Sequence, residues 1–280
     1  MYDIVSKAEY WQWLDEKVNL APARGVGLLK HIQDTFILSA LKQTRGQRIL
    51  EFGGGDSRVL KKLSKSNECW NADKFEGAGA GPTRVFRQRG VKTVKAFLGD
   101  FDEAIPADYF DYVISISVVE HVPSDEVNRV FQDCARILKP GGSLLQAIDL
   151  YLPDFADKDD PEFQFNRSRV ALYLRAAEKA GLVLKEPATL EDDVCFRGFH
   201  ASNSDATLYS WNSVAPNLRR VRERAQSVCL KAWWVKPACK VDTMRGVEVD
   251  AVKKDNGDRS VVAQSPEDNA DAISPGEKGH

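Results

Sequence analysis

The residues best suited to chemistry form a glycine-rich turn in the segment RILEFGGGDS, residues 48–57. The apolar run Ile49–Phe52 predicts a short buried strand, and Ser57–Leu63 carries apolar residues at helical spacing. Because glycine has no side chain, three of them in a row at Gly53–Gly55 leave the backbone open to a close-lying ligand. The pattern indicates a binding turn at the carboxyl end of a strand.

The spacing within this turn excludes one class of ligand. A nicotinamide-type fingerprint, G-x-G-x-x-G, would need its third glycine at Arg58, where none stands. What remains is an acidic residue two positions before the first of two spaced glycines: Glu51, Gly53 and Gly55.

Further polar residues follow the next apolar segments. Asp73 ends the second such segment about 20 residues after the turn, where an acid can bind both hydroxyls of a ribose. Three more motifs come after it in order: Leu98-Gly99-Asp100-Phe101, the run FDYVISISVVEHV over 110–122, and ILKPGG over 137–142.

Strands alternate with helical segments from residue 48 onward. The clearest helix is Ser124–Leu138, whose apolar residues repeat at the helical period and which ends at Lys139–Gly142. This alternation predicts right-handed crossovers and an α/β, Rossmann-like, doubly wound, mostly parallel sheet of seven strands, with helices suited to the intervening segments and packed on both faces. The expected strands are Arg48–Phe52, Glu68–Ala72, Thr93–Leu98, Tyr112–Ile116, Ser143–Ile148, Leu182–Leu184 and Ser227–Val235.

The N-terminal part, residues 1–46, is expected to form a helical cap. Ser6 and Glu9 have the spacing of a capping box, and a second helix is predicted over Val26–Lys42.

The rest of the chain divides by composition. A helix is predicted over Ser168–Ala180, after an acidic loop. The end of the chain is rich in charge, Gly, Pro and Ser and poor in aromatics, which is typical of disorder. The expected organisation is a cap at 1–46, a main domain at 47–236 with inserts at 151–167 and 191–212, and a disordered tail at 237–280.

Composition excludes several function classes. The chain has 39 basic and 41 acidic residues, so its net charge of -2 gives no reason to expect a nucleic-acid partner. Its 5 cysteines show no C-x-x-C pair and no nearby histidine at ligand spacing, so we expect reduced thiols and no metal site. Neither a signal peptide nor an apolar stretch of about 20 residues is present, which predicts a cytoplasmic protein without membrane insertion.

With these motifs in this order, the sequence resembles the class I S-adenosylmethionine-dependent methyltransferases, over residues 46–150 by motif and through 236 by strand count. The resemblance implies S-adenosylmethionine as the cofactor. The backbone around Glu51, Gly53 and Gly55 would hold its methionine part, and Asp73 would bind both ribose hydroxyls. The chain departs from the family at Ser57, which replaces the usual third glycine.

The resemblance also implies which residues contact the rest of the cofactor. Asp100 and the Phe101 amide would contact the adenine edge, and the chain at Ile116 and Ser117 would pass the amino-acid end and the sulfonium.

The reaction implied is transfer of an activated methyl group, in which the protein aligns a nucleophile and excludes water. A hydroxyl nucleophile also needs a base, and His121 follows the fourth strand, where the pocket should open. His121 could equally line the pocket or pack as a structural residue. Asp149, at the end of the fifth strand, and His200 are further candidates for substrate contacts.

The acceptor class follows partly by exclusion. The Pro-Pro motif of adenine N-methylation and the Pro-Cys nucleophile of cytosine methylation are absent. A small-molecule acceptor with an oxygen nucleophile remains: a sugar, a quinone- or phenol-like compound, or a natural-product intermediate. The alternatives left open are a protein or RNA methyltransferase and a non-catalytic methyltransferase-like partner subunit.

Overall fold

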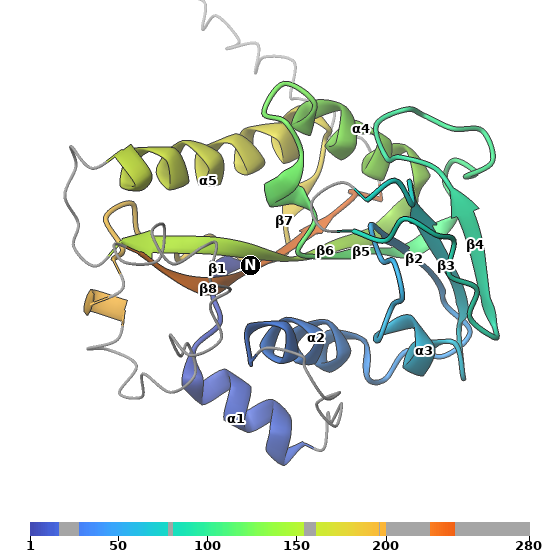
Figure 1. Cartoon of the computed structure of the whole chain (residues 1–280), viewed down its shortest axis with the longest axis horizontal. Helices are drawn as coiled ribbons and strands as arrows, with labels where there is room; N and C mark the ends of the chain where they lie inside the picture. The colour runs from blue at the N-terminus through green and yellow to red at the C-terminus, as the bar shows by residue number, and fades with distance from the viewer. Residues whose placement is uncertain (17–27, 78–80, 154–160, 196, 200–224, 239–280) are drawn as a thin grey trace, which may run out of the picture. The chain divides into compact units, whose positions relative to one another are not determined.

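The computed structural model describes residues 1–16, 28–77, 81–153, 161–195, 197–199 and 225–238 (Figure 1). They all lie in one compact unit, Met1–Val241. His200, the second half of the insert at 191–212, and the tail beyond residue 238 lie outside the described residues.

One sheet of eight strands forms the centre of this unit. The strands are β1 (Tyr2–Ile4), β2 (Arg48–Phe52), β3 (Glu68–Asp73), β4 (Val91–Lys95), β5 (Phe110–Ile116), β6 (Leu138–Pro153), β7 (Val183–Leu184) and β8 (Ala225–Val235). Their order is β1-β8-β6-β5-β2-β3-β4, and β7 pairs with β8 away from this path. Strands β2 to β6 pair in parallel, whereas β8 runs antiparallel to β6, β1 and β7.

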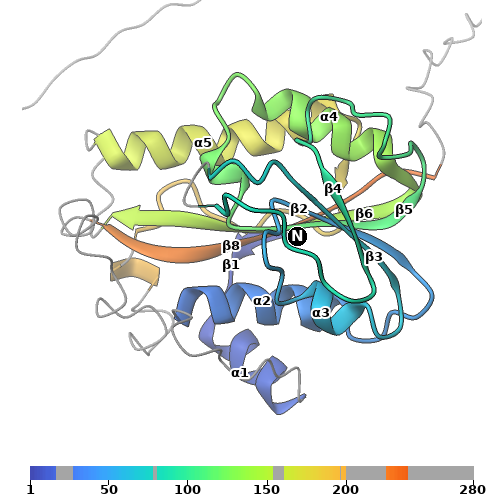
Figure 2. The ribbon, with the colours of Figure 1, turned by 45° about the vertical axis from the view of Figure 1, so that its right-hand side comes forward.

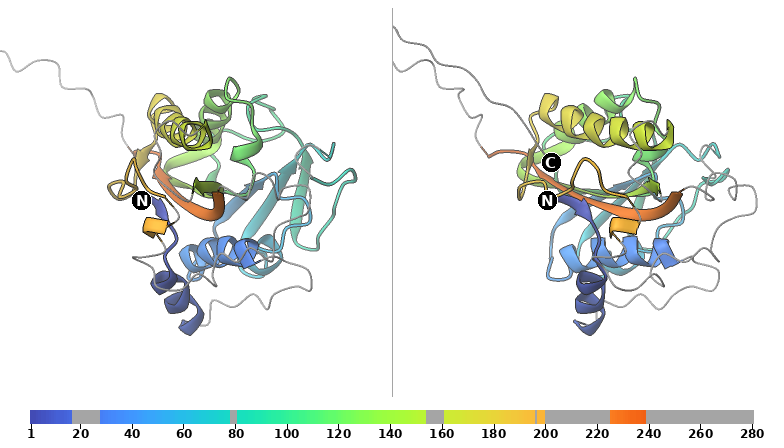
Figure 3. Two further views of the ribbon diagram at one scale, coloured as in Figure 1. Left: turned by 60° about the vertical axis from the view of Figure 1, so that its left-hand side comes forward. Right: turned by 90° about the vertical axis from the view of Figure 1, so that its left-hand side faces the viewer.

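Helices cover both faces of the sheet, as the alternating pattern predicted. They are α1 (Lys7–Asp15), α2 (Leu28–Leu41), α3 (Leu60–Leu63), the short 3-10 turn η2 (Val119–His121), α4 (Val127–Ile137) and α5 (Pro161–Lys179). Figures 1 and 2 show α1, α2 and α3 on one side of the sheet and α4 and α5 on the other, and the two views in Figure 3 show the same layers. The doubly wound fold class is thereby confirmed.

The core forms where the apolar pattern placed it. The central strand β2 is a nearly continuous apolar run because both of its faces are covered, and its Ile49 and Leu50 are fully buried. Helix α4 buries a stripe that includes Val130 and Phe131 against the sheet side. At the start of α1, Ser6 and Glu9 form the expected capping box.

Four local expectations were wrong. Tyr2–Ile4 is a strand and not a helix, because it completes the edge of β8 through long-range pairing. Residues 74–77 and 81–90, and also 99–109, contain no helix; Gly77, Gly81 and Pro82 disfavour one in the first connection. Helix α5 starts at Pro161 and not at Ser168. Lys139–Gly142, which we expected to end the helix as a turn, lies within β6, which begins at Leu138; the pairing of β6 with β5 shifts its register there.

Register brings the strand ends of the binding motifs together. Phe52 of β2 is level with Ala72 of β3, and Glu51 is level with Ile114 of β5. The residues that follow these strands therefore meet at one edge of the sheet. Within the described residues, no helix has the length and apolar character needed to cross a membrane.

Candidate active site

A cavity of about 470 Å³ opens at the carboxyl ends of the parallel strands. This volume lies in the range of small-molecule and cofactor sites. Four of the residues singled out from the sequence line it: Gly53, Asp73, Ser117 and His121. The remaining wall includes Phe52, Ala72, Lys74, Ala96, Phe97, Leu98, Val118, Val122, Pro123 and Val130.

The glycine turn approaches the opposite wall so closely that a side chain would not fit. Gly53 has φ +64°, and a Cβ on it would lie 2.6 Å from Cγ2 of Val118. Gly55 does not line the cavity. Its N–H donates to Oδ2 of Asp73 at 3.0 Å, and its carbonyl accepts from Nδ2 of Asn71 at 2.8 Å. Gly55 thus fixes the shape of the turn and the position of the carboxylate.

Asp73 is held by backbone donors on both sides. Oδ2 accepts from Gly55, and Oδ1 accepts from the N–H of Phe75 at 2.7 Å. Each carboxylate oxygen has a second lone pair, so both can still accept from a diol in the cavity. The ribose contact expected of Asp73 stays a prediction for these free lone pairs.

Glu51 lies behind the turn and not on the cavity wall. Its side chain is buried and hydrogen-bonded to Ser57 Oγ, which also accepts from the N–H of Leu60. Burial raises the pKa of Glu51 to about 7, against the lowering effect of the Ser57 hydrogen bond. Ser57, at the position of the missing third glycine, therefore has a specific role: it pairs with the buried acid.

The loop after β4 differs in detail from the expected adenine site. Asp100 lies outside the cavity lining, with its Oδ1 3.8 Å from Nη2 of Arg129, and Phe101 is 38% exposed. Ala96, Phe97 and Leu98 line the cavity at this strand end.

A residue that sequence reasoning missed organises this loop. Asp133 on α4 is buried, and its Oδ2 accepts from the N–H groups of Gly99 at 2.8 Å and Phe101 at 3.2 Å. Its Oδ1 accepts from Arg136 at 2.8 Å. The available signal was a carboxylate next to Cys134 on an otherwise apolar helix face.

Replacing Asp133 with alanine should lower the free energy of unfolding by about 2–4 kcal/mol, because buried amides lose their acceptor. Urea denaturation measures this loss. Gln132→Ala, on the exposed side of the same helix, is the matched control and should leave stability nearly unchanged. Equal effects of the two substitutions would contradict the role given to Asp133.

Ser117 also belongs to a group of polar side chains that contact one another. We call this group, formed by Lys30, Gln33, Ser117 and Asp149, the Asp149 cluster. Ser117 has φ +54° and its Oγ contacts both Asp149 and Lys30; Ile116 lies outside the cavity lining. Nε2 of Gln33 donates to Oδ1 of Asp149 at 2.6 Å, and Nζ of Lys30 is 3.6 Å from the same oxygen. Burial works to raise the pKa of Asp149, but Lys30, Ser117 and Gln33 outweigh it and hold this pKa below its ordinary value.

The turn η2 brings a second carboxyl group next to Asp149. Oε1 of Glu120 accepts from the N–H of Asp149 at 3.3 Å, and its Oε2 is buried without a hydrogen-bond partner among the described residues. Burial, followed by the charge of Asp149, raises the pKa of Glu120 to about 8. At neutral pH the two groups therefore carry one negative charge between them. The neighbouring His121 is exposed and lines the cavity.

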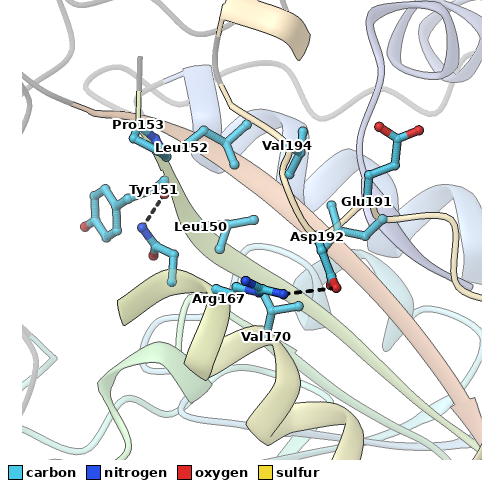
Figure 4. Close-up of a pocket in the computed structure, with 11 residues that line it drawn as sticks. Leu150, Tyr151, Leu152, Pro153, Arg167, Val170, Glu191, Asp192 and Val194 are labelled. Atoms are coloured by element: carbon cyan, nitrogen blue, oxygen red, sulfur yellow. Dashed lines mark hydrogen bonds and ion pairs between the residues drawn. The ribbon is translucent and has the colours of Figure 1, made fainter. Parts of the chain in front are cut away.

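A second hollow lies between β6, α5 and the segment around Leu190 (Figure 4). Arg167 and Asp192 face each other there, with Nη2 and Oδ2 3.4 Å apart. Its volume of about 40 Å³ has room for a water or two and not for a nucleoside.

Known proteins similar to this chain are methyltransferases. Residues 50–146 match the family model described as a methyltransferase domain. A curated relative, the ubiquinone biosynthesis O-methyltransferase of Bradyrhizobium sp. (strain ORS 278), is 23% identical over 141 residues, covering 48% of this chain and 55% of the relative. The chain therefore spans about half the length of that protein.

Solved structures of methyltransferases are also similar. A putative sarcosine dimethylglycine methyltransferase from Galdieria sulphuraria is 17% identical, with a TM-score of 0.48, covering 73% of this chain and 85% of its own. Phosphoethanolamine N-methyltransferase 2 of Haemonchus contortus, solved with S-adenosyl-L-methionine, is 19% identical, with a TM-score of 0.46, covering 73% and 52%.

The family match over 50–146 coincides with the strands that build the cavity. This central part of the chain is therefore similar to a methyltransferase domain. Among the described residues, no group of three or more His, Cys, Asp or Glu side chains is arranged to hold a metal ion.

Proposed function

We propose that this protein transfers the methyl group of S-adenosylmethionine to a small-molecule acceptor through an oxygen nucleophile. The observation that carries the proposal is the joint position of Gly53 and Asp73 on the wall of one cavity at the strand ends. A turn without room for a side chain faces a carboxylate with free lone pairs, which suits a nucleoside with a ribose diol.

Four residues of the cavity wall have a role in this proposal. The cofactor supplies a methyl group activated by its sulfonium. Asp73 binds the ribose hydroxyls, the turn at Gly53 holds the methionine part, and Ser117 borders the amino-acid end. His121, exposed on the same cavity, accepts the proton of the acceptor hydroxyl.

The acceptor side is assigned to Asp149, to His200, and to the segments 151–167 and 191–212 with the N-terminal helices. The Asp149 cluster supports this assignment because Ser117 belongs to both the cluster and the cavity wall. The name of the Bradyrhizobium relative, an O-methyltransferase of ubiquinone biosynthesis, supports an oxygen acceptor of phenol-like type.

Calorimetric titration with S-adenosylhomocysteine tests cofactor binding, and incubation with methyl-labelled S-adenosylmethionine and 3,4-dihydroxybenzoate tests the acceptor class. We expect one-site binding and label on a phenolic oxygen. Absence of binding would leave the domain without its cofactor role. Binding without methyl transfer to any phenol, sugar, protein or RNA tested would favour a non-catalytic partner subunit.

Replacing Asp73 with alanine should weaken binding of S-adenosylhomocysteine by about 1–3 kcal/mol, since the ribose hydroxyls lose a charged acceptor. The same titration measures the change. Asp108→Ala is the matched control, because Asp108 is an exposed carboxylate at the opposite edge of the sheet that pairs with Lys236. An unchanged affinity of the Asp73 variant would show that the ribose contact is misassigned.

A further inference from the structure

The short turn that carries His121 has little to hold it in place by itself. Its internal backbone bonds are those of a single 3-10 turn: His121 N–H to the carbonyl of Val118 at 3.0 Å and Val122 N–H to that of Val119 at 3.2 Å. Such turns have poor hydrogen-bond geometry and are marginal alone. Yet Val118, His121, Val122 and Pro123 make up one wall of the cavity.

A buried arginine from another element binds this turn. Arg169 lies on α5 and is only 7% exposed. Its Nη2 donates to the carbonyl oxygens of Val119 at 2.9 Å, Glu120 at 3.2 Å and Val122 at 3.0 Å. Its Nη1 donates to Oγ of Ser124 at 3.0 Å. One guanidinium thus contacts four residues of the segment that leads from β5 to α4.

Arg169 is itself held in place by Tyr173, a residue of the same helix. Its Nε lies 3.1 Å from the hydroxyl of Tyr173, one helical turn further along α5, and Tyr173 is buried. The next residue, Val170, accepts a hydrogen bond from the hydroxyl of Tyr2 at 2.9 Å, which ties α5 to β1. Figures 1 and 2 show α5 lying beside α4 over the same face of the sheet.

All acceptors of Arg169 named here are neutral carbonyls and hydroxyls. Burying a cation costs free energy, and neutral acceptors offset this cost less well than a carboxylate does. A core with only a structural demand at this position could be filled by an apolar side chain. The planar guanidinium instead suits a task that needs several donors in a fixed geometry.

We propose that Arg169 is a positioning residue of the methyl-transfer site: its guanidinium fixes the carbonyls of η2 and so aims His121 and the wall from Val118 to Pro123 at the cavity. This inference rests on the proposed function, because it gives a purpose to the orientation of that wall.

The test compares Arg169→Met, Arg169→Lys and Arg169→Ala with Arg175→Met in the full-length protein. Arg175 is an exposed arginine on the same helix and lies outside the segments assigned to the acceptor, so it is the matched control. Three measurements are made: urea denaturation, S-adenosylhomocysteine affinity by calorimetry, and the NMR signals of the His121 ring, assigned by their loss in His121→Asn.

We expect the Arg169 variants to unfold cooperatively but to bind S-adenosylhomocysteine about tenfold or more weakly, with shifted His121 ring signals. Lysine should be intermediate. Millimolar methylguanidinium should restore affinity in Arg169→Ala and have no effect on the wild type or on Arg175→Met.

Folded Arg169 variants with wild-type affinity and unshifted ring signals would overturn the inference. So would variants that all fail to fold and that methylguanidinium does not restore, since the role would then be structural. Failure of the wild type to bind S-adenosylhomocysteine would instead overturn the proposed function.

Discussion

Replacing Gly53 with alanine is expected to weaken binding of S-adenosylhomocysteine by about tenfold or more and to lower the free energy of unfolding by about 2–4 kcal/mol. Two effects combine. The residue has φ +64°, which an L side chain adopts at a cost, and its new Cβ would lie 2.6 Å and 2.7 Å from the two methyl groups of Val118.

Rotation of a side chain cannot relieve this clash. Valine side chains are stiff about their first torsion, so Val118 must move with its backbone. Val118 lines the cavity, and any such displacement changes the space available to the cofactor. Calorimetry and urea denaturation of one preparation measure both losses.

Gly46 provides an unusually close control. It has the same φ of +64°, but a Cβ there would meet nothing within 4 Å. Gly46→Ala should therefore cost only the backbone strain, about 1 kcal/mol, and leave cofactor affinity unchanged. If the two alanine variants lost the same affinity and the same stability, the close approach of Gly53 to Val118 would not matter for cofactor binding.

Replacing Glu120 with glutamine should flatten the pH dependence of stability between pH 5 and pH 8. The pKa of Glu120 is about 8 in the folded protein, against an ordinary 4.5, so the folded state binds this proton more tightly than the unfolded chain. The stability that protonation provides is complete below pH 4.5 and is lost as pH rises through about 8.

The size of the effect follows from the shift, with each pKa unit corresponding to about 1.4 kcal/mol, so the loss is on the order of 4 kcal/mol across this range. The glutamine side chain stays neutral and can still accept from the N–H of Asp149. Urea denaturation at four pH values measures the slope for both proteins.

Glu51 also contributes to the pH dependence of stability, because its pKa is raised to about 7. This contribution is present in both proteins. The difference between them therefore isolates Glu120. Glu103→Gln, an exposed site, is the control and should reproduce the wild-type slope. Parallel curves for the wild type and Glu120→Gln would show that the carboxyl group carries its ordinary charge in the folded state.

Local sequence signals were sufficient for the parallel sheet. Apolar runs such as Ile49–Phe52 are strands wherever both faces are covered, and the helix over residues 124–138 was recognisable by its period. Tyr2–Ile4 could not be recognised, because three residues carry no period and their partner β8 is more than 200 residues away. The connections after β3 and β4 were mistaken for helices because alternation alone was applied to segments without a helical pattern.

Some residues of the candidate site could be predicted from the sequence and others could not. The positions of Gly53, Asp73, Ser117 and His121 on the cavity wall were predictable because each lies at or soon after the end of a strand, and parallel strands end at one edge. The roles of buried polar residues on helices, such as Asp133 and Arg169, were not predictable, although a carboxylate on an apolar helix face marks Asp133 as unusual. Their partners are backbone groups of distant loops, and a spacing rule cannot identify those.

The position of β8 between β6 and β1 has a consequence for synthesis on the ribosome. Residues 225–235 supply the neighbour of β6, and they in turn pair with Tyr2–Ile4, which precedes them by more than 200 residues. Until they emerge from the exit tunnel, β6 presents an open edge of backbone donors and acceptors, and Tyr2–Ile4 has no place to dock. During that interval the open edge of β6 is available for pairing with other chains, which favours aggregation of the incomplete protein.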